Sequence, residues 1–143
     1  MASDAPSRPL PSLEEPDTGP FWQAAAQRRL AYQRCTQCDA VVFPPRAHCA
    51  RCMSLALEWQ TSQGLGTVHT CTTTYQHTHP YFRSRTPYTI GLVDVDEGFR
   101  ILAEIGAADG EVEPGSRVRV DWEEHGDVRV PVFIPVPGDG AGR

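Results

Sequence analysis

The residues best suited to chemistry in this sequence are four cysteines arranged as two Cys-x-x-Cys pairs. Cys35 pairs with Cys38 and Cys49 with Cys52. Zinc accepts four thiolates in a tetrahedron, and a two-residue gap lets a tight turn bring both sulfurs of a pair to one ion. The spacing therefore predicts a closed structural zinc site that holds the chain and activates no water. The alternatives are two disulfides, four thiols without metal, or replacement of one sulfur by His48.

A second chemically versatile group follows a threonine-rich stretch. Its members are His77, His79, Tyr81, Phe82, Arg83 and Arg85. A metal site is not expected, because no third ligand is close in the sequence. Aromatic rings and arginines are enriched at the centres of protein interfaces, so we interpret this loop as a partner contact. The alternative is a solvated loop whose rings cap the protein's own core.

The sequence shows no convincing catalytic pair. Cys71 is the one cysteine outside the two pairs, and His69 lies two residues before it. On a strand, two such residues share a face but their Cα atoms lie about 7 Å apart, which is too far for a direct thiol–imidazole contact. We interpret Cys71 as a small, buried thiol. The protein is therefore expected not to be an enzyme by itself.

The charge distribution favours an anion contact in the first half of the chain. The formal net charge is −5, which disfavours a general nucleic-acid-binding protein. Every basic residue is arginine, whose planar fork suits phosphate or carboxylate. The arginines assigned to this anion contact are Arg28, Arg29, Arg34, Arg46 and Arg51, with nearby aromatic rings available for stacking.

One helix and a series of strands must position these residues. Thr18 can cap a helix and Pro20 suits its first turn, so a short helix is predicted as far as Arg29. Phe21 and Trp22 open it, and they either pack on the protein itself or contact a partner. Gly64-Leu65-Gly66 is interpreted as a separator between two parts of the chain. The predicted strands are 30–34, 39–43, 57–60, 67–77, 88–95, 99–105, 117–122 and 128–134, with Pro131 at an edge or a bulge.

We therefore predict a mainly β protein with an N-terminal helix, a rubredoxin-like zinc ribbon and a five-stranded OB-fold barrel. A three-plus-two sandwich is the alternative to the barrel. The predicted divisions are a flexible arm (1–17), the helix with the ribbon (18–62), the OB-fold domain (63–136) and a flexible tail (137–143). The sequence has no apolar run of membrane-spanning length and no secretory signal, so a soluble cytoplasmic protein is expected.

Several motifs resemble those of one known family. Besides the cysteines, they are Phe21-Trp22 with Ala24-Ala25-Ala26, Gln33-Arg34, Pro44-Pro45-Arg46, Glu58-Trp59, Gly64-x-Gly66-x-Val68, Pro87-Tyr88, Asp96-Glu97-Gly98 and Pro131-x-Phe133-x-Pro135. From about Pro20 to Pro135 the sequence resembles the DUF35 family, whose members combine a zinc ribbon with an OB fold in acyl-CoA metabolism. This sequence keeps all four ligand cysteines.

The resemblance implies a non-catalytic subunit of a hetero-oligomer. Its partner would be a thiolase or a lipid-transfer-protein-like aldolase that acts on acyl-CoA thioesters, for example in fatty acyl or steroid side-chain degradation. The five arginines could then contact the phosphates of acyl-CoA, and Zn²⁺ would be the structural cofactor. Two alternatives are a subunit of a hot-dog-fold enoyl-CoA hydratase and a single-stranded nucleic-acid-binding protein.

Overall fold

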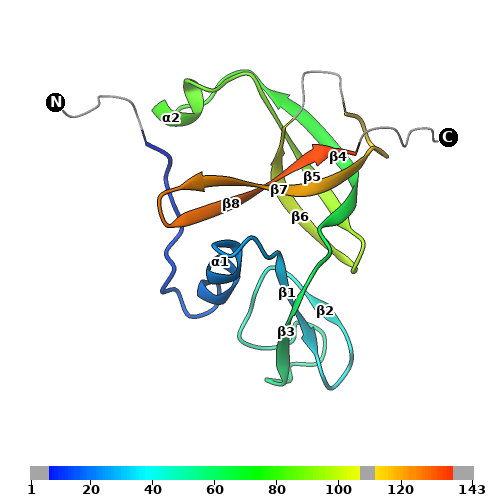
Figure 1. Cartoon of the computed structure of the whole chain (residues 1–143). Coiled ribbons are helices and arrows are strands. Elements are labelled where there is room, and N and C mark those ends of the chain that lie inside the picture. Colours follow the sequence, from blue (N-terminus) through cyan, green and yellow to red (C-terminus); the bar gives the residue numbers. More distant parts are fainter. Residues whose placement is uncertain (1–6, 107–111, 137–143) are drawn as a thin grey trace.

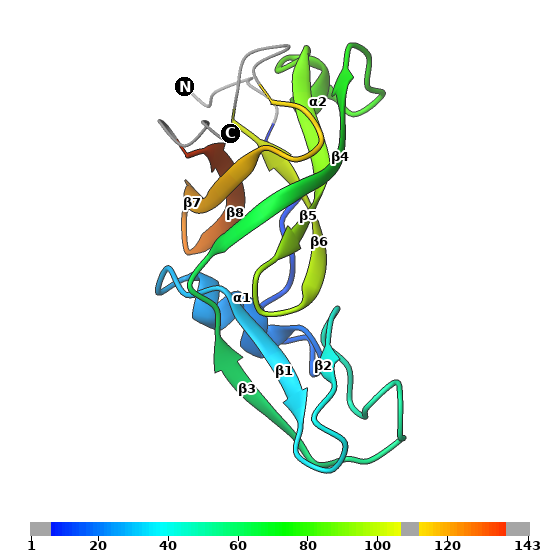
Figure 2. The same ribbon diagram turned by 90° about the vertical axis from the view of Figure 1, so that its right-hand side faces the viewer.

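Strands are the main regular secondary structure in the computed structural model, which describes residues 7–106 and 112–136 (Figure 1). The elements are α1 (Gly19–Ala25), β1 (Ala31–Cys35), β2 (Val41–Val42), β3 (Leu57–Thr61), β4 (Leu65–Thr74), α2 (Pro80–Arg83), β5 (Tyr88–Val95), β6 (Phe99–Ile105), β7 (Arg117–His125) and β8 (Val128–Pro135). Strands β2, β1 and β3 form a small sheet, and β4, β5, β6, β8 and β7 close into a barrel. Figure 2 shows the small sheet projecting from one end of the barrel, beside α1.

The barrel follows from the alternation of apolar and polar residues along its strands. Buried residues alternate with more exposed ones along β5 and β6, as the period of two in a strand requires. All neighbouring barrel strands are antiparallel except β6 and β8, which are parallel and pair only at Glu104–Val132 and Ile105–Phe133. The five-stranded OB-fold prediction is confirmed, and the sandwich alternative is wrong.

Three local predictions are corrected by the structure. Strand β4 begins at Leu65, so Gly66 lies inside it, where an added Cβ would come within 2.8 Å of the Asp94 carbonyl oxygen. The proline-containing loop holds a single helical turn, α2, whose N-terminus is capped by the side chain of His79. Helix α1 ends at Ala25, and Arg28 adopts a positive φ of 62°. The chain therefore turns before the predicted helix end at residue 29.

Aromatic rings join the ribbon to the barrel. The ring of Phe99, at the start of β6, stacks on Tyr32 of β1 at 5.1 Å and on Phe43 at 4.8 Å between centroids. Phe21 of α1 contacts Phe43 at 5.8 Å. These rings belong to the same buried cluster as the barrel interior, so α1 and β1 are anchored in the main core. The region around the cysteines has only a separate, small cluster.

The described part of the N-terminal arm lies against the folded core. Arg8 donates to Glu123 and its guanidinium lies 5.1 Å from the ring centroid of Phe82. Further along the arm, the Leu13 carbonyl accepts a hydrogen bond from Gln23 of α1. Residues 1–6 of the predicted arm and the predicted tail 137–143 lie outside the described residues. No helix in the described ranges is long and apolar enough to cross a membrane.

Candidate metal centre and partner-binding surfaces

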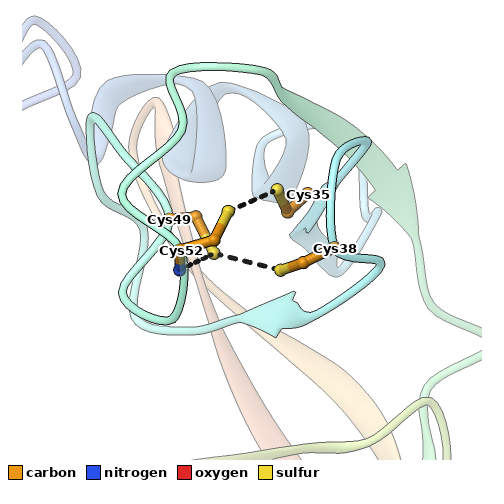
Figure 3. A group of neighbouring side chains, drawn as sticks. All are labelled: Cys35, Cys38, Cys49 and Cys52. Carbon is orange, nitrogen blue, oxygen red and sulfur yellow. Dashed lines mark hydrogen bonds between the residues drawn. The ribbon is translucent and has the colours of Figure 1, made fainter.

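The two cysteine pairs form two knuckles with the same backbone geometry. In each knuckle the carbonyl of the first cysteine accepts a hydrogen bond from the amide four residues later, which is Asp39 after Cys35 and Met53 after Cys49. Asp39 and Met53 both adopt a left-handed conformation, with φ of 65° and 69°. These tight turns direct the cysteine side chains toward a common centre, as Figure 3 shows.

The sulfur positions fit a tetrathiolate zinc site. All four Sγ atoms lie within 4.8 Å of one another, with 3.6 Å between Cys35 and Cys52 and 3.7 Å between Cys38 and Cys49. A tetrahedron with Zn–S bonds of about 2.3 Å has edges of about 3.8 Å, so these separations match zinc ligands. They are far longer than the ~2.05 Å of a disulfide, which makes the disulfide alternative wrong. His48 is not part of the group.

The electrostatics of the centre favour a bound cation. Amide N–H groups of Cys52 and Arg51 donate to the sulfur of Cys49 and lower the pKa of its thiol to about 6. The Ser54 amide also favours the thiolate of Cys52, but desolvation and the three neighbouring sulfurs raise the pKa of Cys52 to about 12. Four crowded sulfurs cannot all be ionised without a positive ion between them. With four protein ligands, zinc here would have no open position and would be structural.

The predicted partner loop is built into one side of the barrel. Phe82 lies at its centre, with ring centroids 4.9 Å from His77 and 5.1 Å from Tyr81. Arg85 donates to Glu104 at 3.0 Å and to Glu123 at 3.1 Å. Many of its side chains therefore contact one another and the barrel. The predicted use of this loop as a partner contact stays a prediction, as does its alternative.

Burial raises the pKa of Glu104, although the nearby guanidinium of Arg85 acts in the opposite direction. Glu123 is also partly desolvated, but hydrogen bonds from His125 and Arg85 keep the pKa of its carboxyl lowered. Arg85 thus bridges two carboxylates that would otherwise repel each other, and Arg8 supplies a second positive charge beside Glu123. This charge network fixes the loop to β6 and β7. Arg83 is outside the network and donates to the carbonyl of Thr78.

The five predicted anion-binding arginines are distributed over both parts of the molecule. Arg28 pairs with Glu124 of β7, and Arg34 pairs with Asp39 in the first knuckle. Arg46 is tied through its backbone to the side chain of Gln33, and Arg51 lies in the second knuckle. Arg29 lines a hollow of about 260 Å³ beside β3, together with Trp59 and Gln60.

Phe21 and Trp22 have different positions despite being neighbours. Phe21 is buried in the main core and also borders the groove described next, so its predicted partner contact stays a prediction. Trp22 is half-buried and lines a groove of about 660 Å³ between the ribbon and the barrel. We call this the β6 groove. Its lining comprises Arg8, Thr18, Phe21, Trp22, Phe43, Pro44, Pro45, Leu92, Arg100, Ile101, Leu102, Ala103, Glu104, Val130 and Pro131.

Sequence reasoning missed most of this groove. Its clearest sequence signal is Leu102, an apolar residue at an outward position of β6, where it is 65% exposed. Leu92 is its partner on β5 and also lines the groove. Two further exposed apolar residues, Met53 and Leu55, lie at the second knuckle and were not predicted as contacts either.

Comparisons with known proteins agree with this two-part architecture. The family model "ChsH2, rubredoxin-like zinc ribbon domain" matches residues 22–58, and "ChsH2, C-terminal OB-fold domain" matches residues 59–123. A "DUF35 domain-containing scaffold protein" from Methanothermobacter thermautotrophicus is 30% identical over 102 residues, covering 69% of this chain and 76% of that protein. This chain belongs to the DUF35 family. Its zinc ribbon carries four cysteines positioned to bind a metal ion.

Two solved structures whose names include DUF35 resemble this chain. A chain of the solved structure "Ltp2-ChsH2(DUF35) aldolase" is 33% identical, with a TM-score of 0.78 over 90% of this chain and 98% of that one. A DUF35 structure from Sulfolobus solfataricus, 15% identical with a TM-score of 0.60 over 87% of this chain and 90% of that one, shares the fold.

Two longer relatives are named as hydratase subunits. The "Probable enoyl-CoA hydratase alpha subunit" of Thermomonospora curvata is 34% identical over 90% of this chain. The "3-oxo-4,17-pregnadiene-20-carboxyl-CoA hydratase alpha subunit" of Mycobacterium tuberculosis is 32% identical over 87% of it. This DUF35 chain spans only 40% and 38% of their respective lengths.

Proposed function

We propose that this DUF35 chain is a non-catalytic accessory subunit that binds and stabilises a thiolase-fold enzyme acting on acyl-CoA thioesters. The partner would be a thiolase or a lipid-transfer-protein-like aldolase. The main support is the likeness to almost the whole ChsH2 chain of the Ltp2-ChsH2(DUF35) aldolase. Helix α1 and strand β1 are anchored in the barrel core, so the chain can hold its ribbon and barrel together as a surface for such a partner.

The chemistry of the described residues supports a non-catalytic role. The zinc ligands leave no position for substrate or water. Cys71 is half-buried and its thiol lies 3.8 Å from the Val112 carbonyl. His69 instead faces Arg100 and Asp94, on the outside of the barrel. A thiol without an adjacent base is a poor nucleophile, so we assign the reaction to the partner.

We propose further that the chain contributes to the binding of acyl-CoA held by its partner. Arg29 and Trp59 line the same hollow, which would let a guanidinium bind phosphate while an indole stacks on adenine. Among the described residues, the guanidinium of Arg29 hydrogen-bonds only to the uncharged side chain of Gln27, so its charge is not neutralised. Isothermal titration of CoA into the chain and into the complex tests this, and heat in neither would exclude it.

A second candidate function is a part of an enoyl-CoA hydratase. The specific observation behind it is the similarity to two hydratase alpha subunits over most of this chain. The matched part is less than half of each of those proteins, so the aldolase-type partner remains our first proposal. Single-stranded nucleic acid is disfavoured by the net charge of −5.

Co-expression tests the proposed function. The tagged chain is produced with each thiolase-fold enzyme of its own genome, and the mass of any complex is measured by light scattering. Cleavage of acyl-CoA is then compared for the enzyme alone, the chain alone and the complex. We expect a stable hetero-oligomer with activity that depends on the enzyme. Thioester turnover by the chain alone, or hydration of enoyl-CoA by a complex with a hot-dog-fold protein only, would contradict the proposal.

A further inference from the structure

The β6 groove contains an incomplete strand pairing. Strands β6 and β8 run parallel, but their pairing is limited to Glu104–Val132 and Ile105–Phe133. Before these pairs the two strands separate, and the facing edges of both strands line the groove. Residues 100–103 of β6 lie on one side, and Val130 and Pro131 of β8 lie on the other. The groove is therefore an open seam in the barrel wall.

Hydrogen-bond alternation shows which backbone groups face this seam. In an antiparallel pair, the N–H and C=O groups of successive residues point alternately toward and away from the neighbouring strand. The Gly106 amide donates to the Phe133 carbonyl at 2.7 Å, so residues of even number near this end of β6 face β8. The pairing of β5 with β6 is regular from Phe99 to Ile105. By the same alternation, the backbone groups of Arg100 and Leu102 face the open seam, where the described residues provide no strand to pair with them.

The seam has little of the usual protection of a strand edge. Natural edges are blunted by proline, by bulges or by charged side chains, and the two charged residues of this edge, Arg100 and Glu104, are each paired within the chain. Of the two strand edges, that of β8 contains a proline, Pro131, whereas that of β6 has no proline and no bulge. Its central side chain, Leu102, is 65% exposed. An open, apolar edge of this kind is a ready surface for an added strand.

The charges around the seam indicate the chemistry of its occupant. Each charged side chain that lines it is already neutralised within the chain. Arg100 pairs with Asp94 at 2.5 Å, Glu104 with Arg85 at 3.0 Å, and Arg8 with Glu123 at 3.4 Å. An anionic ligand such as a phosphate or a fatty carboxylate would find no free cation there. A plain apolar chain would leave the open backbone groups of β6 without partners, which is costly once they are desolvated.

We propose that the β6 groove binds an extended, apolar segment of the partner enzyme, which adds to the barrel as a strand beside β6. A segment of about four residues is enough to pair with Arg100 and Leu102. Its main chain forms hydrogen bonds with this edge, and its side chains pack against Trp22, Phe43 and Leu102. This inference rests on the proposed function, because it names the surface through which the accessory subunit holds its enzyme.

Amide hydrogen exchange of the isolated, ¹⁵N-labelled chain tests the open edge without any partner. The amides of Arg100 and Leu102 should exchange at least about tenfold faster than those of Ile101 and Ala103, which face β5 in the same strand. Slow exchange at Arg100 and Leu102 in the monomer would mean that the chain covers its own edge. Protection that grows with protein concentration would assign the edge to a second copy. Either result overturns the proposal.

Binding to the thiolase-fold enzyme tests the occupant. In the complex, exchange at Arg100 and Leu102 should slow to the rate of their neighbours. Leu102→Lys places a charge in the apolar interface and should weaken the complex about tenfold or more. The matched control is Leu55→Lys, at the second knuckle, where the leucine is 79% exposed and the affinity should not change. Both variants replace exposed leucines, so both should fold, which their amide spectra verify.

The outcomes separate this inference from the proposed function. If the wild-type chain binds no thiolase-fold enzyme of its genome, the proposed function fails and the inference fails with it. If a complex forms but the two amides stay unprotected, or Leu102→Lys binds like the wild type, only the inference fails. Loss of binding in Leu55→Lys alone would place the interface on the ribbon and would also overturn it.

Discussion

Removal of zinc is expected to unfold the two knuckles and leave the barrel folded. The perturbation is either a strong chelator or the double substitution of Cys35 and Cys38 by serine. The physical reason is the unequal distribution of buried apolar groups. Apart from Cys35 and Cys49, which are themselves zinc ligands, Val42 is the single buried residue of the knuckle cluster within the described ranges.

The magnitudes show why zinc decides the state of the knuckles. Burying a valine side chain stabilises a fold by about 1.5–3 kcal/mol. Structural zinc contributes about 10–16 kcal/mol at neutral pH. The main core, by contrast, contains Phe99, Phe133 and eleven other buried residues and uses no metal. The unfolding that follows loss of zinc should therefore be local and should extend no further than the stacked rings of Tyr32 and Phe99.

The assay is amide hydrogen exchange with and without zinc, followed by NMR. In the zinc-bound chain, the amides of Asp39 and Met53 should be protected by their bonds to the cysteine carbonyls. After zinc removal they should exchange freely, whereas the amides of Val68 and Gly115, which bond within the barrel, should keep their protection. Persistent protection at Asp39 and Met53 without metal would refute this reasoning, as would simultaneous loss in the barrel.

Three further substitutions test other contacts. Phe99→Ala should lower the free energy of unfolding in urea by about 3–5 kcal/mol, and a loss below about 1 kcal/mol would contradict its place in the core. A hydrogen bond from Arg117 lowers the pKa of Asp96 in the folded chain. The pair therefore stabilises the fold fully when the pH is above about 4, the pKa of aspartate in the unfolded chain, and this stabilisation is lost as the pH falls through the lower pKa of the folded chain. At neutral pH, Asp96→Asn should thus be less stable than the wild type by under about 1 kcal/mol. The two proteins should be equally stable in acid, where Asp96 of the wild type is protonated in both its folded and unfolded states, and a difference that persists in acid would refute the pairing. Arg85→Ala should raise the pKa of Glu104 further in an NMR titration; an unchanged or lower value would exclude this ion pair.

The sequence predicted the barrel strands best where one face is buried. The predicted bounds of β5 and β6 agree with the structure because apolar residues alternate there without interruption. The start of β4 was missed because glycine was interpreted as a break. At Gly66 the need is for a small residue, since the strand lies close to the Asp94 backbone. This contact between two strands cannot be predicted from the residues around Gly66 alone.

How well each candidate site could be predicted depended on whether its residues lie close together in the sequence. The zinc centre was predicted because its ligands come from two short motifs whose spacing determines their geometry. The β6 groove was not, because it combines residues of the arm, α1, the loop after β2 and three barrel strands. The sequence left open whether Phe21 packs on the protein itself or contacts a partner, because an aromatic residue at a helix start looks the same in sequence whether it is buried or exposed. Its burial follows from contact with Phe43, which is distant in the chain.

The most direct measurement is the acyl-CoA cleavage rate and the mass of the thiolase-fold enzyme with and without this chain. An accessory subunit predicts a defined hetero-oligomer, higher activity or stability of the enzyme in the complex, and no turnover by the chain alone. Unchanged enzyme mass and activity in the presence of excess chain, or turnover by the chain by itself, would contradict that role.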